Sequence, residues 1–167
     1  QQFSFISARH ILEHAASIKN FMTALATKVH PGGYVLLEVP DCEEAIENCD
    51  YSLIWEEHIH YFTVDSLERT LQRLGWRVVK ITRELVEEEA ILIAIAQPPR
   101  EISRPLVEAA SVGRLCVSTN FGKKFEERRQ RVLNFLRETQ RTGSRLYILG
   151  ANHSASNFID LFGEAGL

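Results

Sequence analysis

The sequence predicts an α/β protein whose sheet combines parallel strands with an antiparallel pair at one edge, followed by a helical linker and the start of a second α/β unit. Three observations support this fold class. Residues 34–39 are nearly continuously apolar, which is typical of a strand covered on both faces in a parallel sheet. Helical patterns separate the strands along the chain. Pro98-Pro99 then stops a strand pattern, and the composition beyond it shifts to charged helix.

The Pro-Pro pair sets the predicted domain organisation. Residues 1–97 form the first α/β unit, residues 98–143 a helical linker, and residues 144–167 the beginning of a second unit. A chain of 167 residues is long enough for one core or for parts of two domains. Because the chain enters an apolar strand at once and stops just after a helix, we expect it to be a piece of a longer protein.

The first unit opens with a short strand at residues 3–7 and a turn at residues 8–10. Ser17 is a good N-cap for a helix over residues 18–29, because its hydroxyl can accept a hydrogen bond from a free amide of the first turn. One stripe of this helix is apolar and is expected in the core. It consists of Ile18, Phe21, Met22, Leu25 and Val29. Pro31-Gly32-Gly33 is expected to end the helix and turn the chain.

The apolar strand at residues 34–39 leads into a loop at its carboxyl edge, where open α/β sheets bind their ligands. A weak acidic helix over residues 42–49 follows. Thr63 can cap a further helix over residues 64–74, which Gly75 ends.

Two more strands complete the first unit. They cover residues 76–81 and 90–96, and residues 85–89 form a polar link between them. Such a short connection predicts an antiparallel pair at a sheet edge.

Beyond the Pro-Pro pair we expect a short helix at residues 105–115 and a long one that starts at Asn120 or Ser118 and runs to about residue 140. Residues 146–149 are apolar and predict a buried strand, which a turn at Gly150 joins to a helix running through Phe162. A glycine turn between strand and helix can hold an anion. Here it lacks the further glycines of a dinucleotide-binding fingerprint, so the signal is weak.

Composition narrows the functional classes. The net charge is −3, so electrostatics give no support to nucleic acid as a main partner. No apolar run reaches the length of a membrane span, and we expect no membrane partner. The three cysteines form no Cys-x-x-Cys pair. This argues against a structural zinc site or a disulfide framework, and for a reducing, cytoplasmic compartment.

The stretch from Ile54 to Phe62 is the candidate functional segment. It holds two carboxylates, two imidazoles and three aromatic rings. Its polar residues fit neither the alternation of a strand nor the periodicity of a helix, which favours a loop that carries a site. The alternative is a loop that its aromatic rings hold in place while the charges face water.

A second candidate is the string from His10 to His14, formally H-x-x-E-H, which on a helix can place two histidines and a glutamate around zinc. Such a motif needs a long amphipathic helix, whereas Ala15-Ala16-Ser17 looks like a break followed by a cap. We therefore predict no metal site. One of the two histidines is expected to face a cleft and the other to serve the structure.

The order of strand, Ala-Arg-His-x-Leu-Glu-His, helix, Pro-Gly-Gly and a strand ending Glu-Val-Pro-Asp resembles the second half of a class I S-adenosylmethionine-dependent methyltransferase. The motifs at residues 12–14, 38–41, 54–58 and 61–63 look like those of the nucleotide-sugar (dTDP-sugar type) C-methyltransferase family. That family methylates a carbon next to a ketone in a deoxysugar nucleotide. The resemblance implies a Rossmann-like sheet, S-adenosylmethionine as cofactor, a nucleotide-sugar substrate, and a second Rossmann-like unit that opens at Gly150-Ala151.

The resemblance also implies roles for individual residues. His58 matches the family's general base, and Glu57 would orient it or bind sugar hydroxyls. His14 matches a second imidazole that binds or polarises substrate oxygens. The residues that would line the cofactor side of the cleft, mostly through their backbone, are Ala8, Arg9 and His10.

Two departures from the family pattern affect these roles. Trp55 stands where the family has a tyrosine, and tryptophan has no phenolic proton to offer. Tyr61 is the candidate to supply that group, and we expect Trp55 and Tyr61 to contact the substrate. The family's cysteine-rich zinc unit and glycine-rich cofactor loop would both precede Gln1. We therefore expect this chain to bind S-adenosylmethionine weakly and to be inactive alone.

A non-catalytic nucleotide-binding or assembly module of the same fold is the alternative from a different functional class. In that case, unpaired strand edges would pair with another chain. The sequence leaves a homo-oligomer open.

Overall fold

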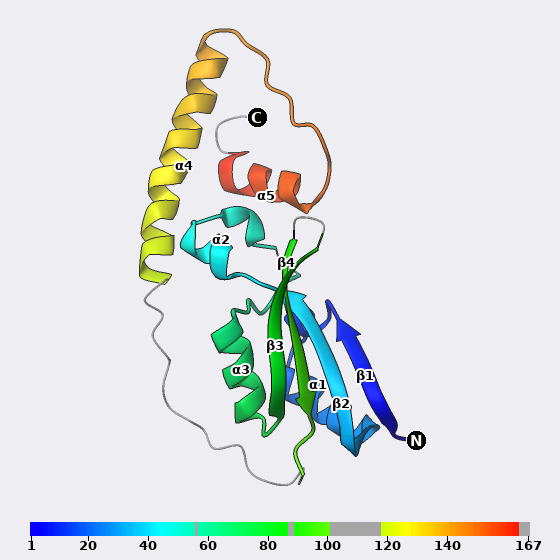
Figure 1. Ribbon diagram of the computed structural model, residues 1–167. Helices are drawn as coiled ribbons and strands as arrows, with labels where there is room; N and C mark the ends of the chain where they lie inside the picture. Colours follow the sequence, from blue (N-terminus) through cyan, green and yellow to red (C-terminus); the bar gives the residue numbers. More distant parts are fainter. Residues whose placement is uncertain (56, 87–88, 101–117, 164–167) are drawn as a thin grey trace. The chain divides into compact units, whose positions relative to one another are not determined.

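The computed structural model describes residues 1–55, 57–86, 89–100 and 118–163 (Figure 1). The chain divides into two compact units. Among the described residues, the first unit takes residues 1–43 and 57–100, and the second takes residues 44–55 and 118–163. The expected short helix at residues 105–115 lies outside the described residues.

The first unit is built on a four-stranded mixed sheet in the order β1-β2-β4-β3. Its strands are β1 (Phe3–Arg9), β2 (Val29–Pro40), β3 (Arg77–Val86) and β4 (Glu89–Gln97). β1 and β2 run parallel, and β4 runs antiparallel to both β2 and β3. Figure 1 shows β1 at one edge of the sheet and β3 at the other. This confirms the predicted α/β class, with parallel strands and an antiparallel pair.

Side-chain caps start two helices of this unit where the sequence predicts them. The Ser17 hydroxyl accepts a hydrogen bond from the Asn20 amide at 3.3 Å and starts α1 (Ile18–Lys28). Thr63 and Ser66 exchange side-chain and backbone hydrogen bonds in a capping box that starts α3 (Val64–Arg73). α1 ends at Lys28 because the next residue already has an extended backbone.

Pro31-Gly32-Gly33 does not end the helix, as the sequence analysis expected, but lies within β2. The register between β1 and β2 shifts here, between Phe3 and Phe5. A Cβ on Gly33 would lie 2.6 Å from the Ser4 carbonyl oxygen. The glycine is therefore required by the close approach of the two strands, which a reading of local turn signals does not reveal.

The core of the first unit forms where the central strands meet the helices. Leu37 of β2, Leu92 of β4 and Leu71 of α3 have an exposed fraction of 0%. Met22 of α1 is also buried, which confirms that its stripe faces the core. Residues 85–86 were expected in a polar link but instead extend β3 with exposed side chains, because their backbones pair with β4.

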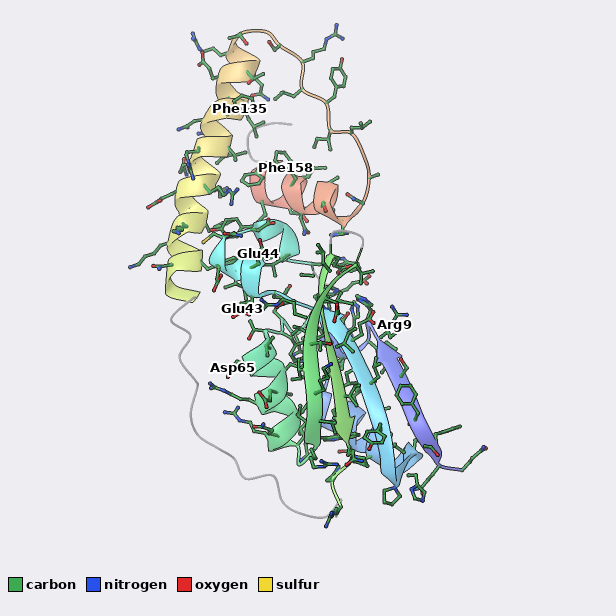
Figure 2. The ribbon with its side chains drawn as sticks, viewed as in Figure 1. Arg9, Glu43, Glu44, Asp65, Phe135 and Phe158 are labelled. Atoms are coloured by element: carbon green, nitrogen blue, oxygen red, sulfur yellow. The ribbon has the colours of Figure 1, made fainter. Side chains whose placement is uncertain are left out.

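The second unit is helical in its described part. It contains residues 44–47 of α2 (Glu43–Glu47), the 3-10 turn η2 (Tyr51–Leu53), α4 (Ser118–Arg141) and α5 (His153–Phe162). Leu133 and Leu136 of α4 form a buried cluster with Phe162 of α5, and Phe158 packs against it. Figure 2 labels Phe158 together with Phe135, which is 66% exposed. None of the described helices combines the length and the apolar character that a membrane span requires.

Residues 146–149 do not form the buried strand that their apolar sequence predicts. Tyr147 is 81% exposed, and Leu149 is fully exposed. A strand needs a neighbouring strand to satisfy its amides and carbonyls, and none of the described strands pairs with this segment. The helix after it forms as expected, with the Asn152 side chain accepting a hydrogen bond from the Ala155 amide at 3.2 Å.

Replacing Leu92 by alanine tests the packing of the central strand. We expect a loss of about 2–5 kcal/mol in the free energy of unfolding, because the change leaves a cavity in the core. Urea unfolding followed by circular dichroism measures it. Leu85→Ala is the matched control on the neighbouring strand, since Leu85 is 74% exposed and its truncation should change stability by less than about 0.5 kcal/mol. Equal losses in the two variants would contradict the assignment of the core.

Candidate functional site

The candidate site lies at the carboxyl ends of β1 and β2, the edge at which open α/β sheets bind their ligands. β1 ends at Arg9, and His10 follows in a left-handed backbone conformation with φ 49°. A residue with a side chain adopts this conformation only under constraint. The constraint is the hydrogen bond from the His10 amide to the Glu38 carbonyl oxygen at 2.9 Å, which attaches the turn to β2.

A second segment, residues 57–60, is fixed beside this turn by main-chain hydrogen bonds. The 3-10 helix η1 (Leu12–His14) follows the turn, and the carbonyl oxygen of its Glu13 accepts the amides of the two residues after His58, at 2.9 and 3.1 Å. His58 is thereby held next to His14. The two rings meet edge to face, with centres 4.8 Å apart and planes at 68°.

The hydrogen bond of His14 defines both its orientation and its tautomer. Its Nδ1 lies 2.8 Å from the carbonyl oxygen of Glu57. A carbonyl group only accepts hydrogen bonds, so Nδ1 carries the hydrogen of the neutral ring. Nε2 then presents its lone pair, and this atom lies 3.9 Å from Oε1 of Glu13.

Charged and titratable side chains alternate along this edge. Arg9, labelled in Figure 2, donates from Nε to Oε2 of Glu38 at 2.9 Å. His10 Nε2 lies 3.1 Å from the other oxygen of Glu38, and His10 Nδ1 lies 3.5 Å from Oε1 of Glu13. At this edge of the sheet, the buried carboxylates of Glu13 and Glu38 therefore lie close to the Arg9 guanidinium and to imidazole rings.

Glu13 is the least compensated of these charges. The residue is 1% exposed, and neither carboxylate oxygen receives a hydrogen bond from the described residues. Buried carboxylates are normally hydrogen-bonded or closely paired with a cation, because desolvation of an unpaired charge is unfavourable. The arrangement is therefore typical of a functional site rather than of a structural turn.

Burial is the largest cause that lowers the pKa of His58 below the ordinary histidine value, and the neighbouring His14 ring lowers it further. The carboxylates of Glu13 and Glu89 act in the opposite direction. The net direction favours the neutral ring, which keeps a lone pair available to accept a proton.

Several residues that the sequence predicts for the site lie together in the first unit. Tyr61 neighbours His58, with ring centres 6.4 Å apart. Glu57 takes part through its carbonyl oxygen, while its side chain is exposed. Ala8 is buried near the end of β1, directly before the turn.

Other predicted site residues have different surroundings from those expected. Arg9 and His10 were expected to act mostly through their backbone, but their side chains are engaged with Glu38. Trp55 belongs to the second unit, where its indole stacks on His153 with ring centres 4.8 Å apart.

Two members of the site, Glu13 and Glu38, were not predicted to act there. The available signal for Glu38 was its position as a single carboxylate within an otherwise apolar strand, because a buried charge needs a partner. For Glu13 the sequence gives only its place between two histidines. Its burial depends on the distant segment that covers it, so it cannot be inferred from neighbouring residues.

Comparison with known proteins finds a partial similarity to one class of domain. Residues 1–81 match the family model of a methyltransferase domain. The C-methyltransferase NovU from Streptomyces niveus is 26% identical over 91 residues, which cover 54% of this chain and 22% of that protein. The chain thus spans about a fifth of the length of this relative.

Solved structures with a partial likeness include the glycopeptide N-methyltransferase MtfA in complex with S-adenosylmethionine. It is 16% identical with a TM-score of 0.46, over 59% of this chain and 55% of that one. An O-methyltransferase family protein from Burkholderia thailandensis is 15% identical with a TM-score of 0.40, over 59% of this chain and 31% of that one.

The family match includes η1 and residues 57–61, and therefore His14, His58 and Tyr61. It supports a methyltransferase domain in this part of the chain, the class of domain that the sequence motifs imply.

The proton on His14 provides a direct check of the site geometry. We expect Nδ1 to carry the hydrogen of the neutral ring, because its partner, the Glu57 carbonyl, cannot donate. Long-range ¹⁵N–¹H NMR correlation distinguishes the two ring nitrogens.

His30 is the matched control for this measurement. Its Nδ1 accepts a hydrogen bond from the Gly32 amide at 3.2 Å, so its neutral ring carries the hydrogen on Nε2. A hydrogen on Nε2 of the neutral His14 ring would contradict its assigned contact with the Glu57 carbonyl.

Proposed function

We propose that this chain is part of an S-adenosylmethionine-dependent methyltransferase that methylates a carbon next to a ketone in a keto-deoxysugar nucleotide. The observation that carries the proposal is the His14–His58 pair at the ends of β1 and β2, in which burial lowers the pKa of His58. The methyltransferase-domain match and the similarity to a C-methyltransferase support it.

Methylation at such a carbon requires a base, because a proton beside a ketone is only weakly acidic. His58 would accept this proton on a ring nitrogen, and the electron pair of the broken C–H bond would move into the enolate. The lowered pKa of His58 supports this role, since the ring is neutral at the start of the reaction. S-adenosylmethionine supplies the electrophilic methyl group.

The enolate oxygen that forms needs a hydrogen-bond donor. We assign this role to the Tyr61 hydroxyl, because Trp55 has none and the Tyr61 ring neighbours that of His58. His14 then acts as a positioning residue, since its Nδ1 hydrogen is used on the Glu57 carbonyl. The exposed Glu57 carboxylate is free to accept hydrogen bonds from sugar hydroxyls.

The edge of the sheet suits a cationic cofactor. Two carboxylates, Glu13 and Glu38, are buried there, and one of them has no hydrogen-bond donor among the described residues. A carboxylate without a donor attracts a cation such as the sulfonium of S-adenosylmethionine. In this proposal the residues that hold the cofactor are Ala8, Arg9 and His10.

The variant His58→Gln, made in the full-length protein, tests the assignment of His58 as the general base. We expect methyl transfer to a keto-deoxysugar nucleotide to fall by about 100-fold or more, because a glutamine cannot accept the proton. Formation of S-adenosylhomocysteine measures the transfer. Solvent deuterium exchange at the carbon beside the ketone measures proton removal alone, and we expect it to be lost in parallel.

His30→Gln is the matched control, because His30 is an exposed histidine of the same unit. We expect it to keep full activity, and both variants to bind S-adenosylhomocysteine as the parent protein does in calorimetry. A His58→Gln variant that retains exchange and transfer would remove His58 as the base. If the unsubstituted protein binds neither the cofactor nor the sugar nucleotide, the alternative hypothesis of a non-catalytic assembly module is favoured.

A further inference from the structure

We propose that Glu13, His14 and His58 bind one divalent transition-metal ion of the zinc class. The proposal goes beyond methyl transfer. One donor atom from each of the three residues lies within 4.8 Å of the others. The H-x-x-E-H string alone does not create this site, because the third donor comes from residue 58 and not from His10.

The buried carboxylate of Glu13 is the first observation. Both oxygens lie in the interior with no hydrogen-bond donor among the described residues. The nearest side-chain nitrogen paired with Glu13 is Nδ1 of His10 at 3.5 Å, and the His10 side chain is 41% exposed. His10 is shared with Glu38, which it approaches more closely, at 3.1 Å. Of the carboxylates in the described site, Glu13 would therefore be stabilised most by a bound cation.

The tautomer of His14 is the second, independent observation. Its Nδ1 hydrogen is donated to a backbone carbonyl, so Nε2 carries the lone pair of the neutral ring, and this atom lies 3.9 Å from Oε1 of Glu13. Metal-binding histidines show this pattern, in which one nitrogen donates to a carbonyl and the other binds the ion. Two electron-rich groups face each other here, and a positive charge between them removes the repulsion.

The separation of these two groups favours a metal ion over a shared proton. A charge-assisted hydrogen bond would bring Nε2 and Oε1 to about 2.7–2.9 Å. Ligands around tetrahedral zinc, with bonds of about 2.0–2.2 Å, lie roughly 3.4 Å apart. The observed 3.9 Å is too long for a hydrogen bond, and the three donor atoms, which lie within 4.8 Å of one another, would approach by up to about 1.4 Å to reach the spacing of zinc ligands.

The donor set indicates which metal would bind. Two imidazole nitrogens and one carboxylate oxygen suit zinc, cobalt and nickel, whereas magnesium and calcium prefer oxygen ligands. Three protein ligands leave one position of a tetrahedral ion open to water or another small ligand.

Bound metal has a consequence for the proposed reaction, and this part of the inference rests on the proposed function. If His58 binds the ion through the nitrogen that accepts the proton, it cannot act as a base at the same time. Zinc would then inhibit methyl transfer, and removal of the ion by a chelator would restore it.

Metal binding is tested on the metal-free chain without reference to activity. We expect one equivalent of Co²⁺ to give visible d–d absorption of a tetrahedral site and one equivalent of Zn²⁺ to displace it. Glu13→Gln should weaken zinc affinity at least tenfold in calorimetry, because it removes the charged ligand. The exposed-residue variants Glu84→Gln and His30→Gln are matched controls and should bind as the parent does.

NMR of the unmodified chain provides a readout that needs no variant. Zinc should shift the ring signals of His14 and His58 and leave those of His30 in place. Absence of stoichiometric binding, or shifts spread over all histidines, would overturn the proposal. Loss of methyl transfer in His58→Gln with no zinc binding in the parent chain would reject the metal site alone. Zinc binding in the parent chain with full activity of His58→Gln would reject the proposed base alone.

Discussion

A single backbone carbonyl, that of Glu13, holds the candidate site together. It accepts the amides of Ile59 and His60, and thereby ties a loop to a turn that is distant in sequence. His14 strengthens the connection with a bond to a residue 43 positions away. His60 adds a further contact between the two segments, because its Nε2 lies 2.9 Å from the Ala15 carbonyl oxygen.

The same segment is anchored at its other end. The Cys42 amide donates to the carbonyl oxygen of Phe62 at 2.8 Å, and the Phe62 ring is buried in the core of the first unit. The residues between the Glu13 contact and Phe62 are therefore held in place by the main chain at both ends, as catalytic and binding groups require. Behind them lies the apolar core of the first unit.

Local signals in the sequence were sufficient for much of the fold. Ser17 and Thr63 mark helix starts because a cap acts on amides within its own first turn. Residues 34–39 mark a covered strand because their composition reports burial directly. The sequence named candidate residues one by one, but the contacts of His10 with Glu38 depend on two strands meeting, which no local pattern contains.

The predictions that the structure does not confirm also concern features that depend on contacts between segments distant in sequence. Residues 146–149 have the composition of a strand, yet a strand exists only with a partner, and composition does not supply one. Gly33 was interpreted as a turn signal, whereas its role depends on the Ser4 carbonyl of the neighbouring strand. Trp55 is close to His58 in sequence but belongs to the other compact unit, because a boundary between the units falls between them.

The strand order also determines how the first unit can assemble. β4 comes after the other described strands in the sequence, yet it lies between β2 and β3, where Val35 pairs with Ala96 and Pro40 with Ile91. The β3–β4 hairpin can form early, but its junction with β2 requires closure of a long loop, which slows folding. On the ribosome, the apolar face of β2 would stay open until the chain beyond Gln97 emerges, and chaperones would have that interval in which to bind it.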